Sequence, residues 1–449
     1  MNPVLPAAPV SLHLHPEPYL YSDWVPLCAS GLAPGQIVTL ELEHVDDVGQ
    51  RWLASAELSA DAEGVVDTTD APSRRGSYLG TSRDGLLWSM APAGVADRTA
   101  FMAQARSFMH MAGQPGGDKL QPRRHTLRVL DGGRVLAEGH FSQTRLGPGV
   151  RVQELAEGPV RGLAFHPAPG AAPARGAVLS LTGSGGGVEN SWAPLLASHG
   201  IPVLSAATFA WPGRPELMQH IDLAYFEQAA LWMRQHFGVQ RIAVQGGSRG
   251  GELTLVLAAY RPDLFCGGVA MVPFHNVVAG FDHLRNVHEG PSWVLDGQPL
   301  LYADVRVTLS GPDAVHTPDG IAVTPDYQRD AASADADARC GIPVERCGGP
   351  LLLLSGREDA MWPSAYGGDR VIDRLRRHGL AHRAEHLAFE NVGHYLVPPG
   401  QPTAMCASLY HPLAKITLAC GGQPRATAEA GREAWVRMLR FYRELFGPR

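Results

Sequence analysis

The chain has 449 residues, of which 45% are hydrophobic and 18% are charged. At roughly 100–200 residues per domain this length predicts two or three domains, and the apolar fraction excludes intrinsic disorder over most of the chain. The net charge of −6 argues against a protein that coats nucleic acid, and the lack of any run of about 18 apolar residues argues against a membrane-spanning helix.

The compartment is predicted from the N-terminus and the cysteines. Residues 1–16 are rich in proline, with neither a basic cluster nor a long apolar run, so we expect no secretory signal. None of the six cysteines forms a Cys-x-x-Cys pair. We therefore expect reduced thiols in a cytoplasmic protein, although a disulfide between Cys340 and Cys347 is conceivable. Lys119 and Lys415 are the only lysines in the sequence, and neither is followed by Ser or Thr, which excludes a P-loop because that motif ends in Lys-Ser/Thr.

The first 150 residues have the pattern of a β-sandwich. Apolar and polar residues alternate over residues 37–43, 52–58 and 125–130, with turn signals such as Ala33-Pro-Gly35 between them. Period-two alternation with frequent turns predicts an antiparallel sandwich domain over residues 1–150.

From residue 151 onward the pattern changes to short apolar strands that alternate with helices. Strands are predicted at 160–166, 177–181, 202–205, 241–245, 268–272, 350–354 and 386–389, and helices at 191–199, 222–237, 252–260 and 429–445. This alternation predicts a mostly parallel sheet flanked by helices over residues 151–449. Residues 279–349 break the rhythm and are rich in Asp and Gly, so we expect a lid or excursion near the site.

A nucleophile is predicted within Gly246-Gly-Ser248-Arg-Gly250, which fits the Gly-x-Ser-x-Gly elbow of α/β-hydrolases. The motif lies between an apolar strand and an apolar helix, as the elbow requires. The alternative interpretation is a structural glycine-rich turn.

A serine nucleophile needs a base, and in α/β-hydrolases the order along the chain is Ser, acid, His. Asp359 follows the strand at 350–354, with Glu358 as its competitor, and both could instead be solvated turn carboxylates. His394 follows the strand at 386–389 and is predicted to be the base. Four other histidines are interpreted as surface or structural residues: His378, His382, His386 and His411.

Oxyanion donors are expected from backbone amides. One is the amide of Arg249, and the others lie in the loop 183–187, at Ser184 and Gly185. A nucleotide-phosphate loop is the alternative, but Val188 stands where its third glycine belongs.

No metal or cofactor site is predicted: His13 and His15 lack partners, and the tryptophans are expected in the core or a pocket wall (Trp88, Trp192, Trp211 and Trp362).

Several longer motifs together are highly specific. They are the Ser248 elbow and Gly31-Leu-Ala-Pro-Gly35, Gly76-Ser-Tyr-Leu-Gly80, Gly85-Leu-Leu-Trp88-Ser-Met90, Gly183-Ser-Gly-Gly-Gly187, Ile221-Asp-Leu-Ala-Tyr-Phe-Glu227, Ile342-Pro-Val-Glu-Arg346, Gly356-Arg-Glu-Asp-Ala-Met-Trp362, Gly393-His-Tyr-Leu-Val-Pro-Pro399 and Ala428-Glu-Ala-Gly-Arg-Glu-Ala-Trp435. With these motifs the chain resembles the acyl-CoA thioesterase / bile acid-CoA:amino acid N-acyltransferase family along nearly its whole length. The resemblance implies an immunoglobulin-like first domain, an α/β-hydrolase second domain, and a triad of Ser248, Asp359 and His394, which favours Asp359 over Glu358.

The resemblance also implies the reaction. Thioesterases of this family use a serine nucleophile and the transferases a cysteine, so Ser248 implies hydrolysis of acyl-CoA in fatty acid metabolism, without a cofactor. Acyl transfer to an amine or alcohol, general ester or amide hydrolysis, and a non-catalytic binding protein are the alternatives. Arg249 departs from the animal pattern. It is expected either to meet an anionic acyl group or the CoA phosphates, or to form a surface salt bridge with Glu252.

Overall fold

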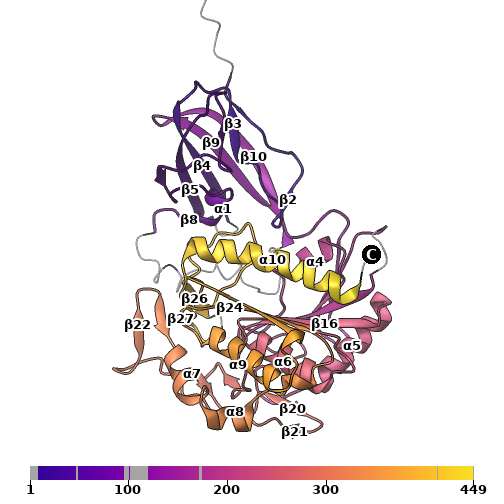
Figure 1. Cartoon of the computed structure of the whole chain (residues 1–449). Coiled ribbons are helices and arrows are strands. Elements are labelled where there is room, and N and C mark those ends of the chain that lie inside the picture. Colours follow the sequence, from indigo (N-terminus) through magenta and orange to yellow (C-terminus); the bar gives the residue numbers. More distant parts are fainter. Residues whose placement is uncertain are drawn as a thin grey trace, which may run out of the picture.

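The computed structural model describes residues 9–46, 49–95, 101, 120–170, 174–411 and 413–447, so Lys119 and most of the N-terminal stretch lie outside it. A β-sandwich stands at one end of the molecule, and a larger α/β domain occupies the other (Figure 1). All six cysteines are free thiols, including Cys340 and Cys347. Within the described ranges, no helix combines the length and the apolar run needed to cross a bilayer.

The sandwich consists of a seven-stranded and a three-stranded sheet. The larger sheet contains β2 (Tyr19–Leu20), β10 (Arg134–Thr144), β9 (Arg123–Asp131), β4 (Ile37–Val45), β5 (Arg51–Ser59) and β7 (Arg75–Gly76), with β8 (Ala91–Pro92) paired to β5. The smaller contains β1 (Ser11–Leu12), β3 (Cys28–Ser30) and β6 (Val66–Asp67). The three predicted strands are confirmed as β4, β5 and β9. Their alternate residues, such as Val38, Leu40 and Leu42, are buried in the sandwich core, as half-buried strands require.

The α/β domain is built on one eight-stranded sheet. Its strands, in spatial order, are β11 (Arg151–Leu155), β12 (Gly162–His166), β14 (Val203–Ala206), β13 (Gly176–Leu181), β16 (Arg241–Gly247), β17 (Gly268–Met271), β24 (Leu351–Gly356) and β25 (Ala384–Phe389). Strands β11 and β12 are antiparallel, whereas β14 to β25 run parallel. The expected α/β-hydrolase architecture is confirmed, and the fully buried central strands account for the continuous apolar runs in the sequence.

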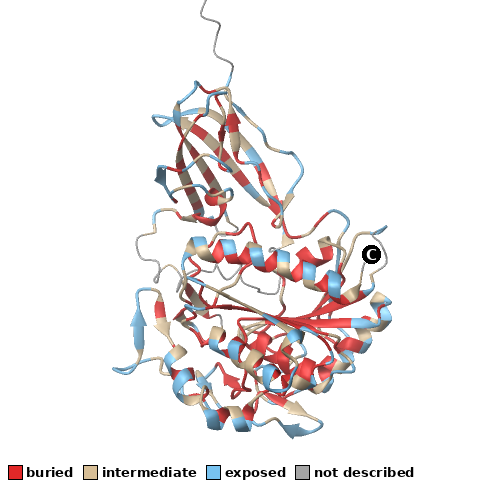
Figure 2. Cartoon of the chain, viewed as in Figure 1, coloured by how far each residue is buried: buried red, intermediate tan, exposed pale blue. Residues whose placement is uncertain are grey.

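Helices cover both faces of this sheet (Figure 2). The helices α5 (Ala224–Phe237), α6 (Arg249–Tyr260) and α9 (Ser364–Arg377) share one apolar core with the sheet. On the other face, α4 (Ala193–Ser198) and α10 (Pro424–Phe446) share a second core. Two helices begin earlier than predicted, α6 at Arg249 and α10 at Pro424. Proline is well suited to the first turn of a helix, because its missing N–H has no helical partner there.

Residues 279–349 form an ordered excursion of short elements. These are β18 (Phe281–Asp282), β19 (Val287–His288), β20 (Trp293–Leu295), β21 (Gln298–Pro299), β22 (Val315–Thr317), β23 (Gly320–Ala322), α7 (Thr324–Asp330), α8 (Ala334–Cys340) and the 3₁₀ turn η2 (Val344–Arg346). Strand β20 pairs with β15 (Ile221–Asp222), and β23 pairs with β27 (Ile416–Ala419), which pairs with β26 (Ser408–His411). The excursion is therefore joined by strand pairing to β15 and to the C-terminal segment that carries β26 and β27.

The sandwich contacts the segment that follows the 3₁₀ turn η3 (Ala381–Arg383) and β25. Arg145 donates to the Gln401 side chain at 3.0 Å. The Thr403 amide donates to the carbonyl of Trp88, in the short helix α1 (Gly85–Trp88), at 2.8 Å. Met405 and Ala428 are part of the sandwich core. Residues of both domains thus hold the chain between β25 and α10.

Candidate active site

Ser248 occupies a strained turn between β16 and α6. Its backbone angles are φ 58° and ψ −123°, a region that residues with a side chain rarely adopt and that is found mainly at functional sites. The neighbouring glycines are required by close packing. A Cβ on Gly246 would collide with the Gly250 carbonyl, and one on Gly250 would lie 2.5 Å from the Thr182 carbonyl oxygen.

Asp359 and His394 meet at the same edge of the sheet, after β24 and β25. His394 Nδ1 lies 2.8 Å from Asp359 Oδ2 and 3.1 Å from Oδ1. The carboxylate is held by the amides of Met361 and Trp362 and by the Ser364 hydroxyl, at 3.0, 3.2 and 2.6 Å. Because the ionised carboxylate only accepts, Nδ1 carries the proton and Nε2 is left as the acceptor.

The three residues predicted as a triad come together after β16, β24 and β25. Ser248 and His394 line the same two cavities. No hydrogen bond joins them, and His394 Nε2 has no partner among the described residues. Catalytic hydrogen bonds are often long in unliganded enzymes and tighten when substrate binds. Glu358, the competitor of Asp359, is exposed, whereas Asp359 is buried.

The glycine-rich loop after β13 lies directly against the nucleophile. A Cβ on Gly183 would be 3.1 Å from Ser248 Cβ and 3.6 Å from its Oγ. The next residues, Ser184 and Gly185, line the larger cavity, and within the described part of the chain no acceptor is recorded for their amides. Arg249 is the first residue of α6, so its amide has no intrahelical acceptor. All three predicted oxyanion residues thus lie beside Ser248.

Arg249 forms a buried ion pair with Glu252, so the expectation of a surface salt bridge was wrong. The two side chains are 2.7 Å apart, and their exposed fractions are 3% and 0%. Arg249 also donates to the Val278 carbonyl at 3.1 Å and to the Ser292 hydroxyl, and Trp293 donates to Glu252 at 2.8 Å. Burial raises the pKa of Glu252, and the adjacent guanidinium opposes this rise. Residues of the excursion enclose the pair. The spacing of Arg249 and Glu252 in the sequence could not reveal this burial.

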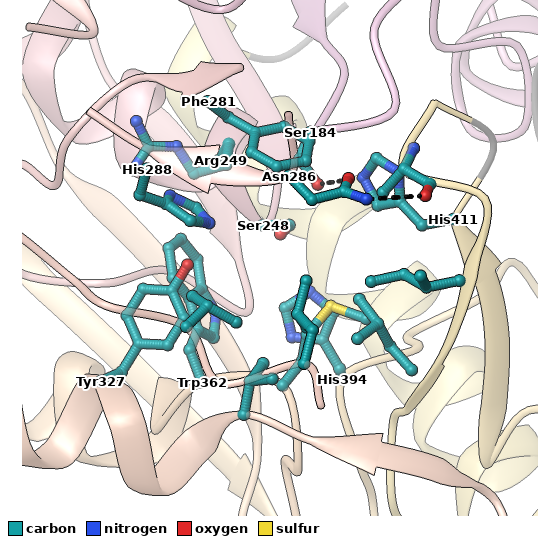
Figure 3. Close-up of a pocket in the computed structure, with 17 residues that line it drawn as sticks. Ser184, Ser248, Arg249, Phe281, Asn286, His288, Tyr327, Trp362, His394 and His411 are labelled. Carbon is teal, nitrogen blue, oxygen red and sulfur yellow. Dashed lines mark hydrogen bonds between the residues drawn. The ribbon is translucent and has the colours of Figure 1, made fainter. Parts of the chain in front are cut away.

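Ser248 lines two cavities, of which Figure 3 shows the smaller. The smaller, about 60 Å³, has walls from the excursion and β27, including Phe281, Leu309, Tyr327 and Leu418. The larger, about 490 Å³, lies along the glycine-rich loop and the chain after His394. Trp362 lines the smaller and Trp192 the larger, as expected of pocket-wall residues.

His411 was interpreted as a surface or structural residue, but it lines both cavities. Its Nε2 lies 3.0 Å from the Ser184 hydroxyl. His288 and Asn286 also line the smaller cavity. None of the three stands in a motif, so only the fold could reveal them. The described residues contain no group of three or more His, Cys, Asp or Glu side chains that could hold a metal ion.

Comparisons with known proteins agree over both domains. Residues 23–157 match the family described as "Acyl-CoA thioester hydrolase/BAAT N-terminal region", and residues 221–448 match "BAAT / Acyl-CoA thioester hydrolase C terminal". The chain is 31% identical to mouse mitochondrial acyl-coenzyme A thioesterase 2, covering 96% of this chain and 89% of the relative. It is 30% identical to human acyl-coenzyme A thioesterase 1, covering 95% and 94%. Mouse peroxisomal succinyl-coenzyme A thioesterase is 31% identical, with 96% of each chain covered. The chain therefore belongs to the acyl-CoA thioester hydrolase/BAAT family.

Proposed function

We propose that this protein is an acyl-CoA thioesterase that works through an acyl-enzyme on Ser248. The observation that carries the proposal is the Asp359–His394 pair, whose unpartnered Nε2 faces the same cavities as the strained serine. Membership of the family and the names of the relatives support a thioester substrate.

In this mechanism His394 Nε2 takes the proton of Ser248 while Oγ attacks the thioester carbonyl carbon. The carbonyl oxygen becomes an oxyanion, which the amides of Arg249 and of Ser184 or Gly185 stabilise. Collapse of this intermediate breaks the C–S bond, and the His394 imidazolium protonates the CoA thiolate. His394 then deprotonates a water molecule that attacks the acyl ester, and the proton it gains returns to Ser248 as the free acid leaves.

The two cavities suggest how the substrate is divided at the nucleophile. We assign the smaller cavity to the acyl group, because its walls are mainly apolar side chains of the excursion and β27. The larger cavity then holds the pantetheine arm, whose amides can bond to polar groups such as those of the glycine-rich loop. Arg249 is bound to Glu252 and does not serve the CoA phosphates.

The domain boundary near residue 150 belongs to the same proposal. The last strand of the sandwich ends at Thr144, and the first strand of the eight-stranded sheet begins at Arg151. We place the sandwich in residues 1–150 and the catalytic domain in residues 151–449, in a cytoplasmic enzyme of fatty acid metabolism.

The test is release of free CoA thiol from acyl-CoAs, from acetyl to palmitoyl, by the purified full chain. We expect turnover of at least one chain length and its loss in Ser248→Ala. A parallel reaction with added amino acids or alcohols, analysed by mass spectrometry, separates hydrolysis from acyl transfer. If conjugates form in place of free acid, the proposed reaction is wrong.

A further inference from the structure

The Ser184 hydroxyl has an unused proton next to the nucleophile. His411 Nδ1 accepts the amide N–H of Ala414 at 3.0 Å. A neutral imidazole whose Nδ1 accepts must carry its proton on Nε2. Nε2 therefore donates to Ser184 Oγ, 3.0 Å away, as the dashed line in Figure 3 marks. Since Oγ is the acceptor of this bond, its own proton is free to point elsewhere.

His411 is held rigidly in this tautomer. The residue is 4% exposed, and the Phe281 ring packs edge-on against its imidazole with centroids 5.4 Å apart. The Asn286 side chain donates to the Ala414 carbonyl at 3.2 Å, which braces the turn that supplies the amide. Burial, with a smaller contribution from nearby His283, lowers the pKa of His411 to about 4, so the ring stays neutral near pH 7.

The free proton of Ser184 lies at the reacting centre. Ser184 lines both cavities together with Ser248 and His394, and a Cβ added to the preceding residue, Gly183, would be 3.6 Å from Ser248 Oγ. Within the described part of the chain, no acceptor is recorded for the Ser184 hydroxyl proton. A hydroxyl whose oxygen is held in place and whose proton is unengaged can donate to an oxyanion that forms there.

We infer that the Ser184 hydroxyl is a side-chain donor to the oxyanion, added to the backbone amides, and that His411 is the positioning residue that orients it. The inference rests on the proposed acyl-enzyme at Ser248. His411 gains and loses no proton in the cycle. It fixes the hydroxyl oxygen by its own hydrogen bond and leaves the hydroxyl proton directed at the substrate.

The experiment compares four variants of the full chain with the wild type. Ser184→Ala removes the donor, His411→Leu removes its support, His411→Gln keeps an N–H donor, and Ser184→Ala/His411→Leu combines the losses. We expect kcat to fall about 10²-fold in Ser184→Ala with KM little changed. We expect a similar fall of kcat in His411→Leu, whereas His411→Gln should retain most of the wild-type kcat. The kcat of the double variant should be no lower than that of Ser184→Ala.

A second measurement keeps the test independent of the thioester substrate. The phosphoryl oxygen of a fluorophosphonate occupies the oxyanion site when Ser248 is labelled, so the labelling rate constant should fall in parallel in Ser184→Ala and His411→Leu. If no acyl-CoA is turned over but these labelling rates still fall, the substrate proposal fails and the role of Ser184 stands. His386→Gln, a change at a partly buried histidine that lines neither cavity, serves as the matched control and should label at the wild-type rate.

Three outcomes would overturn the inference. Wild-type kcat and labelling in Ser184→Ala would remove the hydroxyl from the oxyanion site. A further loss on adding His411→Leu to Ser184→Ala would show that His411 acts by another route. A displaced acid limb in the kcat/KM pH profile of His411→Gln would make His411 a titrating base, whereas orientation alone leaves that limb unchanged.

Discussion

In the part of the chain that the structure describes, two sets of serine, histidine and aspartate have their histidine in or just after β25. In one set, Ser355 Oγ lies 2.6 Å from His386 Nε2, and His386 Nδ1 lies 3.0 Å from Asp369. In the other set, Asp359 and His394 are bonded, but Ser248 is not yet joined to His394. By hydrogen bonds alone, the Ser355 set is the more complete triad.

The difference lies in access and in strain. Ser355 is 1% exposed within β24 and lines neither of the cavities that meet at Ser248. Ser248 sits at positive φ, at the start of a helix, and lines both cavities. The two carboxylates also differ in exposure: the Asp369 side chain is 57% exposed, whereas that of Asp359 is 2% exposed. A site that can react keeps its groups unsatisfied until substrate arrives, whereas a structural cluster satisfies them within the fold.

The largest expected effect separates the two serines. Ser248→Ala should lower kcat by a factor on the order of 10⁴ or more, because no nucleophile remains. Ser355→Ala is the matched control and should keep kcat near the wild type. Release of CoA thiol measures both, and loss of turnover in Ser355→Ala alone would exchange the roles of the two sets.

The two carboxylates give the next largest contrast. In Asp359→Asn the side-chain amide favours the imidazole tautomer whose Nε2 is protonated and cannot accept from Ser248. We expect kcat to fall about 10³–10⁴-fold. Asp369→Asn changes a mostly exposed partner and should leave kcat near the wild type, as steady-state kinetics on the two purified variants would show. Equal losses would contradict the comparison.

Gly368 allows a test of the structural role of the set formed by Ser355, His386 and Asp369. A Cβ on Gly368 of α9 would overlap the His386 ring, so Gly368→Ala should lower the free energy of unfolding by about 1–3 kcal/mol. Chemical denaturation measures this loss. In a His386→Ala background the overlap is relieved, and the same glycine change should cost less. An undiminished cost there would place the strain elsewhere.

The smallest effect concerns pH. Burial lowers the pKa of His386 below its usual 6.5, although Asp369 opposes the shift. The unfolded chain therefore binds a proton at this residue before the folded chain does, and its stabilising contribution, present above pH 6.5, is lost as the pH falls toward the folded pKa.

His386→Gln removes both this titration and a hydrogen bond worth about 1 kcal/mol. The variant should be less stable than the wild type at about pH 7.5, and the gap should narrow toward about pH 5.5. Urea denaturation at both values measures the gap. A gap that widens on acidification would mean that the folded state protonates His386 more readily.

The sequence predicted features that depend on short motifs or on the order of residues along the chain. The elbow is a five-residue signal flanked by a strand and a helix, and the positions of Asp359 and His394 follow from the fixed chain order of α/β-hydrolases. Helix α9 was not predicted, because Gly367 and Gly368 are poor helix formers. In the fold both are needed, since Gly367 packs on Phe274 and Gly368 on His386.

Other features depend on residues far apart in the sequence. His411 and Ser184 are separated by 227 positions, so no spacing rule could join them. The spacing of Arg249 and Glu252 did predict an ion pair. Its burial depends on Val278, just before the excursion, and on Trp293 within it, both further along the chain.

The contacts between the sandwich and the chain after His394 bear on how the enzyme matures. The sandwich is synthesised first and can fold as a unit while the remaining chain is still emerging from the ribosome. The segment that carries His394 emerges near the end, and it docks against residues made 256 positions before Gln401 and 315 positions before Thr403. We therefore expect the base to be positioned only in the closing step of folding, so that a newly made chain stays catalytically silent until both domains are in place.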